Sequence, residues 1–224
     1  MNVSQALATR KSVRAFTAEA VPRATIEEIL LKAARAPSGG NLQPWKVHVL
    51  LGSARDELVR RAKAQLAVNP RGGVPEYNIY PPHLTEPYRA RRYRIGEAMY
   101  ATMNIGREDK LHRLLQFARN WEFFGAPVGL IFSIDRQMQP GQWADLGMFL
   151  QSIMLLAREH GLHSCAQEAW APLHEVIRDY LNIPAEEMIF CGMALGYADE
   201  TAAINTLISE RAPLEEWAVF RDSA

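Results

Sequence analysis

The chain has no excess of charge of either sign. Its 224 residues carry 25 Lys and Arg against 25 Asp and Glu, a formal net charge of zero. A dedicated nucleic-acid binder needs clustered excess positive charge, because much of its affinity comes from releasing the counterions of the phosphates. The neutral balance argues against that class. A hydrophobic content of 48% argues against intrinsic disorder, since enough apolar side chain is present to offset the entropy lost on folding.

Long apolar runs and cysteines are also scarce. The longest apolar stretches, such as residues 146–157, fall short of the roughly 20 residues that a helix needs to cross a bilayer. Arg10 and Arg14 interrupt the region where a secretory signal would have its apolar core. The two cysteines, Cys165 and Cys191, have neither metal-ligand spacing nor the density of a disulfide scaffold. We therefore expect reduced core cysteines, no metal site and no membrane span in a cytoplasmic protein.

The order of apolar patterns predicts one domain over residues 1–224, because no repeat or linker divides the chain. Helices are expected over residues 3–9, 25–37, 53–66, 89–104, 109–124, 143–160 and 172–180, and strands over 46–51, 127–134, near 163 and over 188–195. Thr25 with Glu28 suggests a capping box, and Ser53 suggests a cap for the next helix. Residues 67–88 form a long irregular stretch of a kind that is often functional. This order predicts a mixed sheet covered by helices.

The first candidate ligand site is the basic segment at residues 10–14. If the segment is extended, Arg10, Ser12 and Arg14 point to the same side, because side chains alternate along a strand. Two guanidinium groups and a hydroxyl on one face suit a phosphate, since arginine binds phosphate oxygens in pairs. The alternative is a solvated basic turn.

Three further segments carry weaker signals. In residues 37–45 the glycines allow a ligand to approach the backbone, while Asn41 and Gln43 offer donors and acceptors; a plain helix-to-strand turn is the alternative. Residues 165–170 follow a strand and precede a helix, where α/β proteins commonly bind ligands, although a connecting loop would look the same. Arg211, followed by Pro213, offers one more guanidinium group but does not by itself indicate a ligand site.

Together these segments resemble the nitroreductase family of FMN-dependent oxidoreductases. The resemblance rests on Arg-x-Ser-x-Arg at residues 10–14, on Pro-Ser-Gly-Gly-Asn-Leu-Gln-Pro-Trp at 37–45 and on Arg-x-Pro at 211–213. Residues 123–127, 167–170 and 191–197 are similar to its nitrobenzoate-reductase-like branch. The likeness extends from residue 3 to residue 220.

The resemblance implies an α+β fold in which helices sandwich a mixed β-sheet. It also implies an intertwined homodimer with two FMN sites at the interface and a C-terminal tail that wraps the partner. The residues implied at the FMN phosphate and ribityl chain are Arg10, Lys11, Ser12, Arg14 and Arg211. Those implied to line the flavin are Pro37, Ser38, Gly39, Asn41 and Gln43 from the other subunit, and the backbone of Ala166, Gln167 and Glu168 near flavin N5.

The implied activity is ping-pong hydride transfer. NADH or NADPH would reduce flavin N5, and a nitroaromatic or quinone-type acceptor would then take the electrons, so no catalytic side chain is nominated. Tyr80 and Phe124 are expected to stack on a small aromatic acceptor, and Phe123 either joins them or packs in the core or at the dimer contact. The arginines of residues 89–94 suit an acidic aromatic substrate or the 2′-phosphate of NADPH, or simply form a charged helix face.

Other functions on the same fold stay open. A flavin-dependent dehalogenase or dehydrogenase would share these motifs, because a fold does not determine the reaction. A protein that stores or senses FMN without turnover would share them too. Whether the Glu168 side chain acts near N5 or points away is likewise left open by the sequence.

Overall fold

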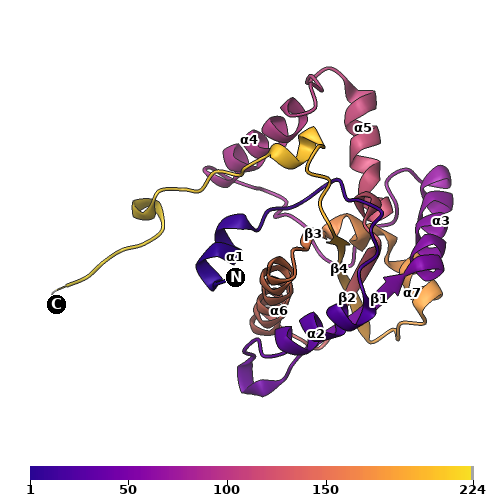
Figure 1. The fold of residues 1–224 in the computed structure, drawn as a ribbon, viewed down its shortest axis with the longest axis horizontal. Helices are drawn as coiled ribbons and strands as arrows, with labels where there is room; N and C mark the ends of the chain where they lie inside the picture. Colours follow the sequence, from indigo (N-terminus) through magenta and orange to yellow (C-terminus); the bar gives the residue numbers. More distant parts are fainter. Residues whose placement is uncertain (223–224) are drawn as a thin grey trace.

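A single four-stranded sheet forms the centre of the chain. This computed structural model describes residues 1–222, so the last two residues of the expected 1–224 domain lie outside it. The spatial order of the strands is β1 (Trp45–Leu51), β2 (Val128–Asp135), β4 (Glu187–Gly196) and β3 (His163–Gln167) (Figure 1). The α+β class is confirmed, with one refinement. All three strand pairs are antiparallel, and within residues 1–222 parallel pairing is confined to a bridge between Ser12 and Ser164.

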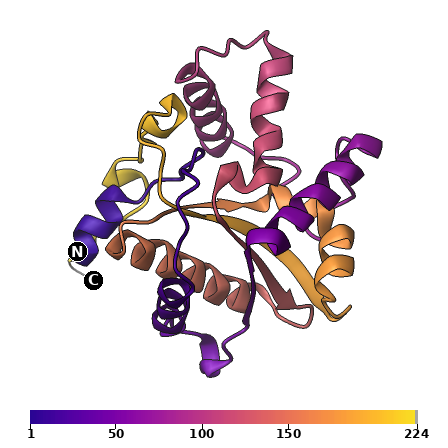
Figure 2. The same cartoon turned by 45° about the vertical axis from the view of Figure 1, so that its right-hand side comes forward.

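Helices cover both faces of the sheet. The helices α2 (Arg23–Ala33) and α6 (Pro140–Glu159) pack on one face, and α3 (Gly52–Val68) and α7 (His174–Leu181) pack on the other (Figure 2). Strand β2 shows the cause, since Leu130 and Phe132 face α6 while Ile131 faces the opposite layer. Because both faces are apolar, the strand is buried on both sides. The strand expected over residues 127–134 is therefore confirmed, and it lies inside the sheet.

Strand β4 contains a β-bulge. Phe132 of β2 lies opposite Cys191, but the next residue, Ser133, lies opposite Ile189, which leaves Phe190 as the extra residue. The Tyr77 hydroxyl donates a 2.6 Å hydrogen bond to the Phe190 carbonyl oxygen. The irregular stretch that contains Tyr77 is thereby anchored at the bulge.

The periphery is built differently from this centre. Helices α4 (Tyr88–Ala101) and α5 (Lys110–Ala118) project together from the body and contain no buried residue (Figure 2). Helix α1 (Val3–Thr9) lies beside α6, and the segment after residue 206 leaves the body (Figure 1). The short 3-10 turns are η1 (Gly39–Asn41), η2 (Arg119–Gly125), η3 (Glu168–Leu173), η4 (Ala203–Thr206) and η5 (Leu214–Glu216). Among the described residues, none of the helices has the length and apolarity to span a bilayer.

Several expected helix ends are wrong. Helix α2 starts at Arg23 and not at Thr25, because the Pro22 carbonyl already accepts the first hydrogen bonds of the helix. Helix α3 starts at Gly52 without a side-chain cap, so Ser53 is not its cap. The helix expected over 109–124 ends at Ala118, where the chain tightens into η2.

Candidate functional site

The basic segment at residues 10–14 is extended and runs beside the edge strand β3. The Val13 N–H donates a 3.1 Å hydrogen bond to the Ser164 carbonyl. Val13 is fully buried, so the alternation of an extended chain turns Ser12 and Arg14 to the outer side. Burial raises the pKa of the neighbouring Cys165 thiol, and the positive charges of Arg14 and Arg10 oppose that rise. These groups therefore gather at one place beside β3.

The two guanidinium groups of this segment are largely uncommitted. Within residues 1–222 the Arg10 side chain forms no ion pair or hydrogen bond, and the Arg14 side chain donates only to the Ser12 carbonyl at 3.2 Å. A guanidinium without a carboxylate partner can pair with a phosphate. Lys11 is different, because its Nζ donates a 2.6 Å hydrogen bond to the Asn205 carbonyl. The Lys11 ammonium group therefore binds the segment after β4.

Asn205 supports the basic segment and was not expected from the sequence. Its buried side chain accepts a 2.8 Å hydrogen bond from the Arg14 N–H and donates to the carbonyls of Ala15, at 2.8 Å, and Asp199, at 2.9 Å. These bonds hold the basic segment against the chain that follows β4. A single asparagine in a stretch of weak periodicity resembles a turn residue, so no sequence signal marked it.

The second predicted segment forms a tight loop at the start of α6. It holds Pro37, Ser38, Gly39, Asn41 and Gln43. The Gly39 N–H donates a 3.1 Å hydrogen bond to Asp145 Oδ2, and Ser38 Oγ accepts one of 3.0 Å from the Gln43 N–H. Gly40 takes a positive φ of 59°, which glycine adopts without strain. The loop is thus held in shape by Ser38 within it and by Asp145 of α6.

A single chain does not bring these two segments together. Arg158 donates a hydrogen bond to Thr9 next to the basic segment, whereas Asp145 holds the Gly39 loop. Asp145 and Arg158 are thirteen residues apart in α6, which at about 1.5 Å per residue separates them by about 20 Å. The predicted halves of the site therefore lie towards opposite ends of one helix.

The third predicted segment ends the edge strand β3. Ala166 is exposed, and Gln167 is buried with its Nε2 donating a 2.7 Å hydrogen bond to the Asn120 carbonyl. The Gln167 Oε1 is buried and has no hydrogen-bond partner among the described residues. An exposed alanine leaves the backbone open to a flat ligand at this point.

The Glu168 side chain is turned towards an aromatic cluster. Its Oε1 lies 3.5 Å from the Tyr77 hydroxyl, and the Tyr77 ring stacks on Phe190 and meets Trp143 edge-on. Burial in these surroundings raises the pKa of Glu168, and the hydrogen bond from Tyr77 opposes the rise. Burial penalises the charged form, so this carboxyl group holds its proton to a higher pH than an exposed glutamate does. Tyr77 is a neighbour of Glu168 that no sequence pattern indicated.

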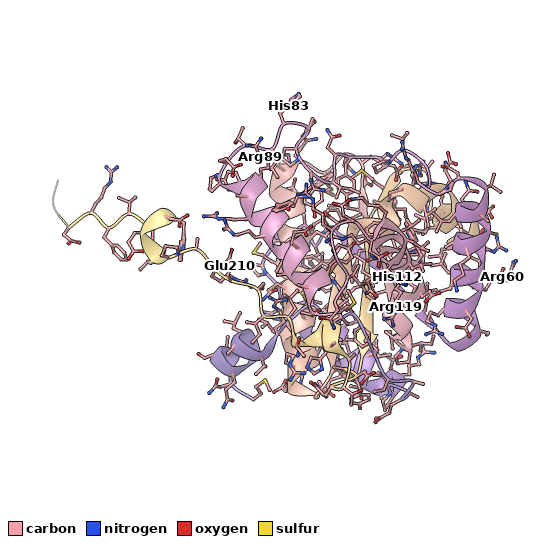
Figure 3. All side chains as sticks on the ribbon, turned by 90° about the horizontal axis from the view of Figure 1, so that it is seen from above. Arg60, His83, Arg89, His112, Arg119 and Glu210 are labelled. Carbon is pink, nitrogen blue, oxygen red and sulfur yellow. The ribbon has the colours of Figure 1, made fainter. Side chains whose placement is uncertain are left out.

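Arg211 lies in a groove of about 670 Å³ between α4 and the tail. Its Nη1 donates a 2.7 Å hydrogen bond to Ser209 Oγ, and none of its hydrogen bonds in the described chain reaches the basic segment. Tyr80 lines the same groove and is 50% exposed. In Figure 3, Arg89 of α4 and Glu210 both lie on the side from which the tail departs.

Phe124 is not available to a substrate. Its side chain is only 1% exposed and belongs to the core between η2 and the sheet. The neighbouring Phe123 is also buried and stacks on Trp170 at 4.6 Å. The expectation that Phe124 stacks on an acceptor is therefore wrong, because the ring is already packed within its own chain.

Known proteins share both this sequence and this fold. A model of the "Nitroreductase family" matches residues 7–197. The chain is 41% identical to a 4-nitrobenzoate reductase of Pseudomonas putida, over 90% of this chain and 87% of the relative. It is 38% identical to a chloronitrobenzene nitroreductase of Comamonas testosteroni, over 94% of this chain and 93% of the relative.

The structure of an FMN and NADPH-dependent nitroreductase from Sphigopyxis sp. strain HMH matches with a TM-score of 0.97 and 45% identity over 100% of both chains. The structure of an FMN-dependent nitroreductase of Mycobacterium smegmatis in complex with NADPH matches with a TM-score of 0.91 and 28% identity, over 98% of this chain and 100% of that chain.

Proposed function

This chain belongs to the nitroreductase family, and from that premise we propose that it is an FMN-dependent NAD(P)H oxidoreductase that reduces nitroaromatic compounds. The names of the relatives support the acceptor class, and the descriptions of the matching structures support FMN and NADPH. The observation that carries the proposal is the pair of guanidinium groups, Arg10 and Arg14, which have no carboxylate partner within residues 1–222 and lie beside the exposed end of β3.

The residues present fit FMN at both of its ends. Arg10, Ser12 and Arg14 offer charged and neutral donors on one side of an extended chain, which is the donor set that a phosphate requires. The exposed Ala166 at the end of β3 leaves room for a flat ring against the backbone. FMN, when bound, supplies the hydride chemistry of its N5. The chain supplies binding and orientation, on which hydride transfer depends.

We infer that two subunits complete each site. The Gly39 loop and the basic segment are too far apart in one chain to hold one small ligand, as the length of α6 between Asp145 and Arg158 requires. In a homodimer the loop of one subunit can meet the basic segment of the other. The exposed apolar side chains of the tail support the same inference, since a partner would cover them.

The visible spectrum of the purified full-length protein tests the activity first. We expect bound flavin that bleaches on anaerobic addition of NADPH or NADH and recovers when a nitroaromatic acceptor is added. Flavin that does not bleach would favour storage or sensing of FMN over turnover. Absence of flavin after incubation with FMN would contradict the proposed site.

Substitution of Arg14 tests the phosphate assignment. Arg14→Ala should lower the retained FMN, because it removes one charge-assisted contact. Arg23→Ala is the matched control, since Arg23 is exposed at the start of α2 and pairs with Glu27. Equal flavin content in the two variants would contradict the assignment of Arg14.

A further inference from the structure

Three of the four arginines at residues 89–94 already have carboxylate partners. Arg89 pairs with Glu86 and Arg94 pairs with Glu210, each at 2.8 Å, and Arg91 pairs with Glu216. The charges of these three arginines are therefore largely neutralised within the chain. The basic run is accordingly not a uniformly charged helix face.

Arg92 is the exception in this run. Within residues 1–222 its guanidinium has neither an ion pair nor a hydrogen bond, and it lies over the Tyr80 ring, 3.9 Å from the centroid. Stacking on a ring occupies the flat face of a guanidinium and leaves its N–H edge free. That edge is the part that forms paired hydrogen bonds to a carboxylate or a phosphate. Tyr80 therefore holds Arg92 in place without using its donors.

The groove around Arg92 has a net positive charge. Four arginines and two glutamates line it, so four positive charges minus two negative charges leave two. The glutamates are the partners of Arg91 and Arg94, which leaves Arg92 and Arg211 as the excess. A volume of about 670 Å³ lies within the range of small-molecule sites. The groove thus combines a small-molecule volume with an uncommitted anion-binding group.

We propose that Arg92, supported by Tyr80, binds an oxyanion that one of the two substrates carries. This inference rests on the proposed function, because that function supplies an aromatic acceptor and a nicotinamide reductant. The oxyanion is the carboxylate of an aromatic acceptor or the 2′-phosphate of NADPH. Both match the free edge of the guanidinium. Arg92 is thus a specificity-determining residue, and Tyr80 is the positioning residue behind it.

Steady-state kinetics of the flavin-loaded, full-length protein identify the source of the oxyanion. The test variant is Arg92→Gln. The matched control is Arg89→Gln, on the same helix but outside the groove. If the carboxylate binds, KM for 4-nitrobenzoate rises about tenfold while KM for neutral nitrobenzene is unchanged, since one charged contact is lost. If the 2′-phosphate binds, the same rise appears with NADPH and not with NADH.

Binding to the oxidised protein provides a second readout that needs no turnover. Calorimetric titration with benzoate and with adenosine 2′-phosphate should show one of them binding to the wild type and to Arg89→Gln, and about tenfold more weakly to Arg92→Gln. Arg92→Lys should restore part of the affinity, because it keeps the charge but not the fork. Tyr80→Leu should weaken binding less than Arg92→Gln.

The outcomes separate this inference from the proposed function. If the flavin bleaches with NADPH but Arg92→Gln behaves as wild type with every probe, the Arg92 site is overturned and the activity stands. If the flavin does not bleach, the activity fails, and the titrations still decide whether Arg92 binds an oxyanion. Equal losses in Arg89→Gln and Arg92→Gln would also overturn the site, because they would reflect a general effect of charge.

Discussion

Large apolar side chains are buried in the sheet core but exposed at the periphery. Trp170 is 0% exposed beneath the sheet, whereas Trp217 of the tail is 69% exposed. Large apolar side chains are also exposed on the projecting helix α5 and along the tail: Leu111, Leu114, Leu115, Phe117, Ile208, Val219 and Phe220. Exposed apolar surface of this extent marks an interface. The core is thus completed within one chain, whereas the periphery leaves apolar side chains that the inferred partner subunit would cover.

The largest loss of stability is expected from substitution of Trp170. The Trp170→Ala substitution removes a fully buried ring that stacks on Phe123, so it should lower the free energy of unfolding by about 3–5 kcal/mol. Urea denaturation measures the loss. Trp217→Ala is the control, and it should leave the secondary structure intact. Similar losses from both variants would remove the distinction between the two regions.

The next largest effect is expected at Gly192 of β4. A Cβ atom there would clash with Trp170 Cδ1, so Gly192→Ala should lower the free energy of unfolding by about 1–3 kcal/mol through overpacking. Gly96 of α4 has open space, and Gly96→Ala should instead stabilise the helix by up to about 1 kcal/mol. The two variants are compared by thermal and urea denaturation. Effects of the same sign would contradict the comparison.

The buried Glu168 carboxyl should make the stability of the fold depend on pH. Burial raises its pKa in the folded state, so the folded state holds the proton more tightly than the unfolded state. Stability from this group is present at low pH and is lost as the pH rises through the raised pKa. Glu168→Gln should therefore raise the Tm at pH 8 and change it little at pH 4. Glu175→Gln on α7 controls for the loss of a surface carboxylate. A larger gain at pH 4 than at pH 8 would contradict this sign.

The smallest effect on the fold is expected from the tail. Removal of residues 217–224 deletes Trp217 and Phe220, which are exposed in the single chain, so circular dichroism should be unchanged. The inferred dimer should weaken, and sedimentation velocity measures this. A truncated protein that remains dimeric at the wild-type affinity would overturn the wrapping tail.

Local patterns predicted much of this fold. The apolar run of β2 and the strongly apolar sequence of α6 indicated buried elements, and the alternate spacing of Arg10, Ser12 and Arg14 predicted a common outer side. These inferences depend on the period of a strand or a helix, which the sequence contains. Helix ends were less predictable, because the Pro22 carbonyl accepts the first hydrogen bonds of α2, whereas the sequence pattern had indicated Thr25 as its cap.

The sequence by itself determined the family, the helix-and-sheet class and the segments that carry charge and glycine. Only the tertiary structure decided which of these groups are free to bind. It buried Phe124, turned Glu168 towards Tyr77 and bound Lys11 to the Asn205 carbonyl. It also paired three arginines and, within residues 1–222, left the donors of Arg92 without a hydrogen-bond partner. The physical reason is that partners distant in the chain satisfy a polar group or cover an apolar one, and no local pattern records them.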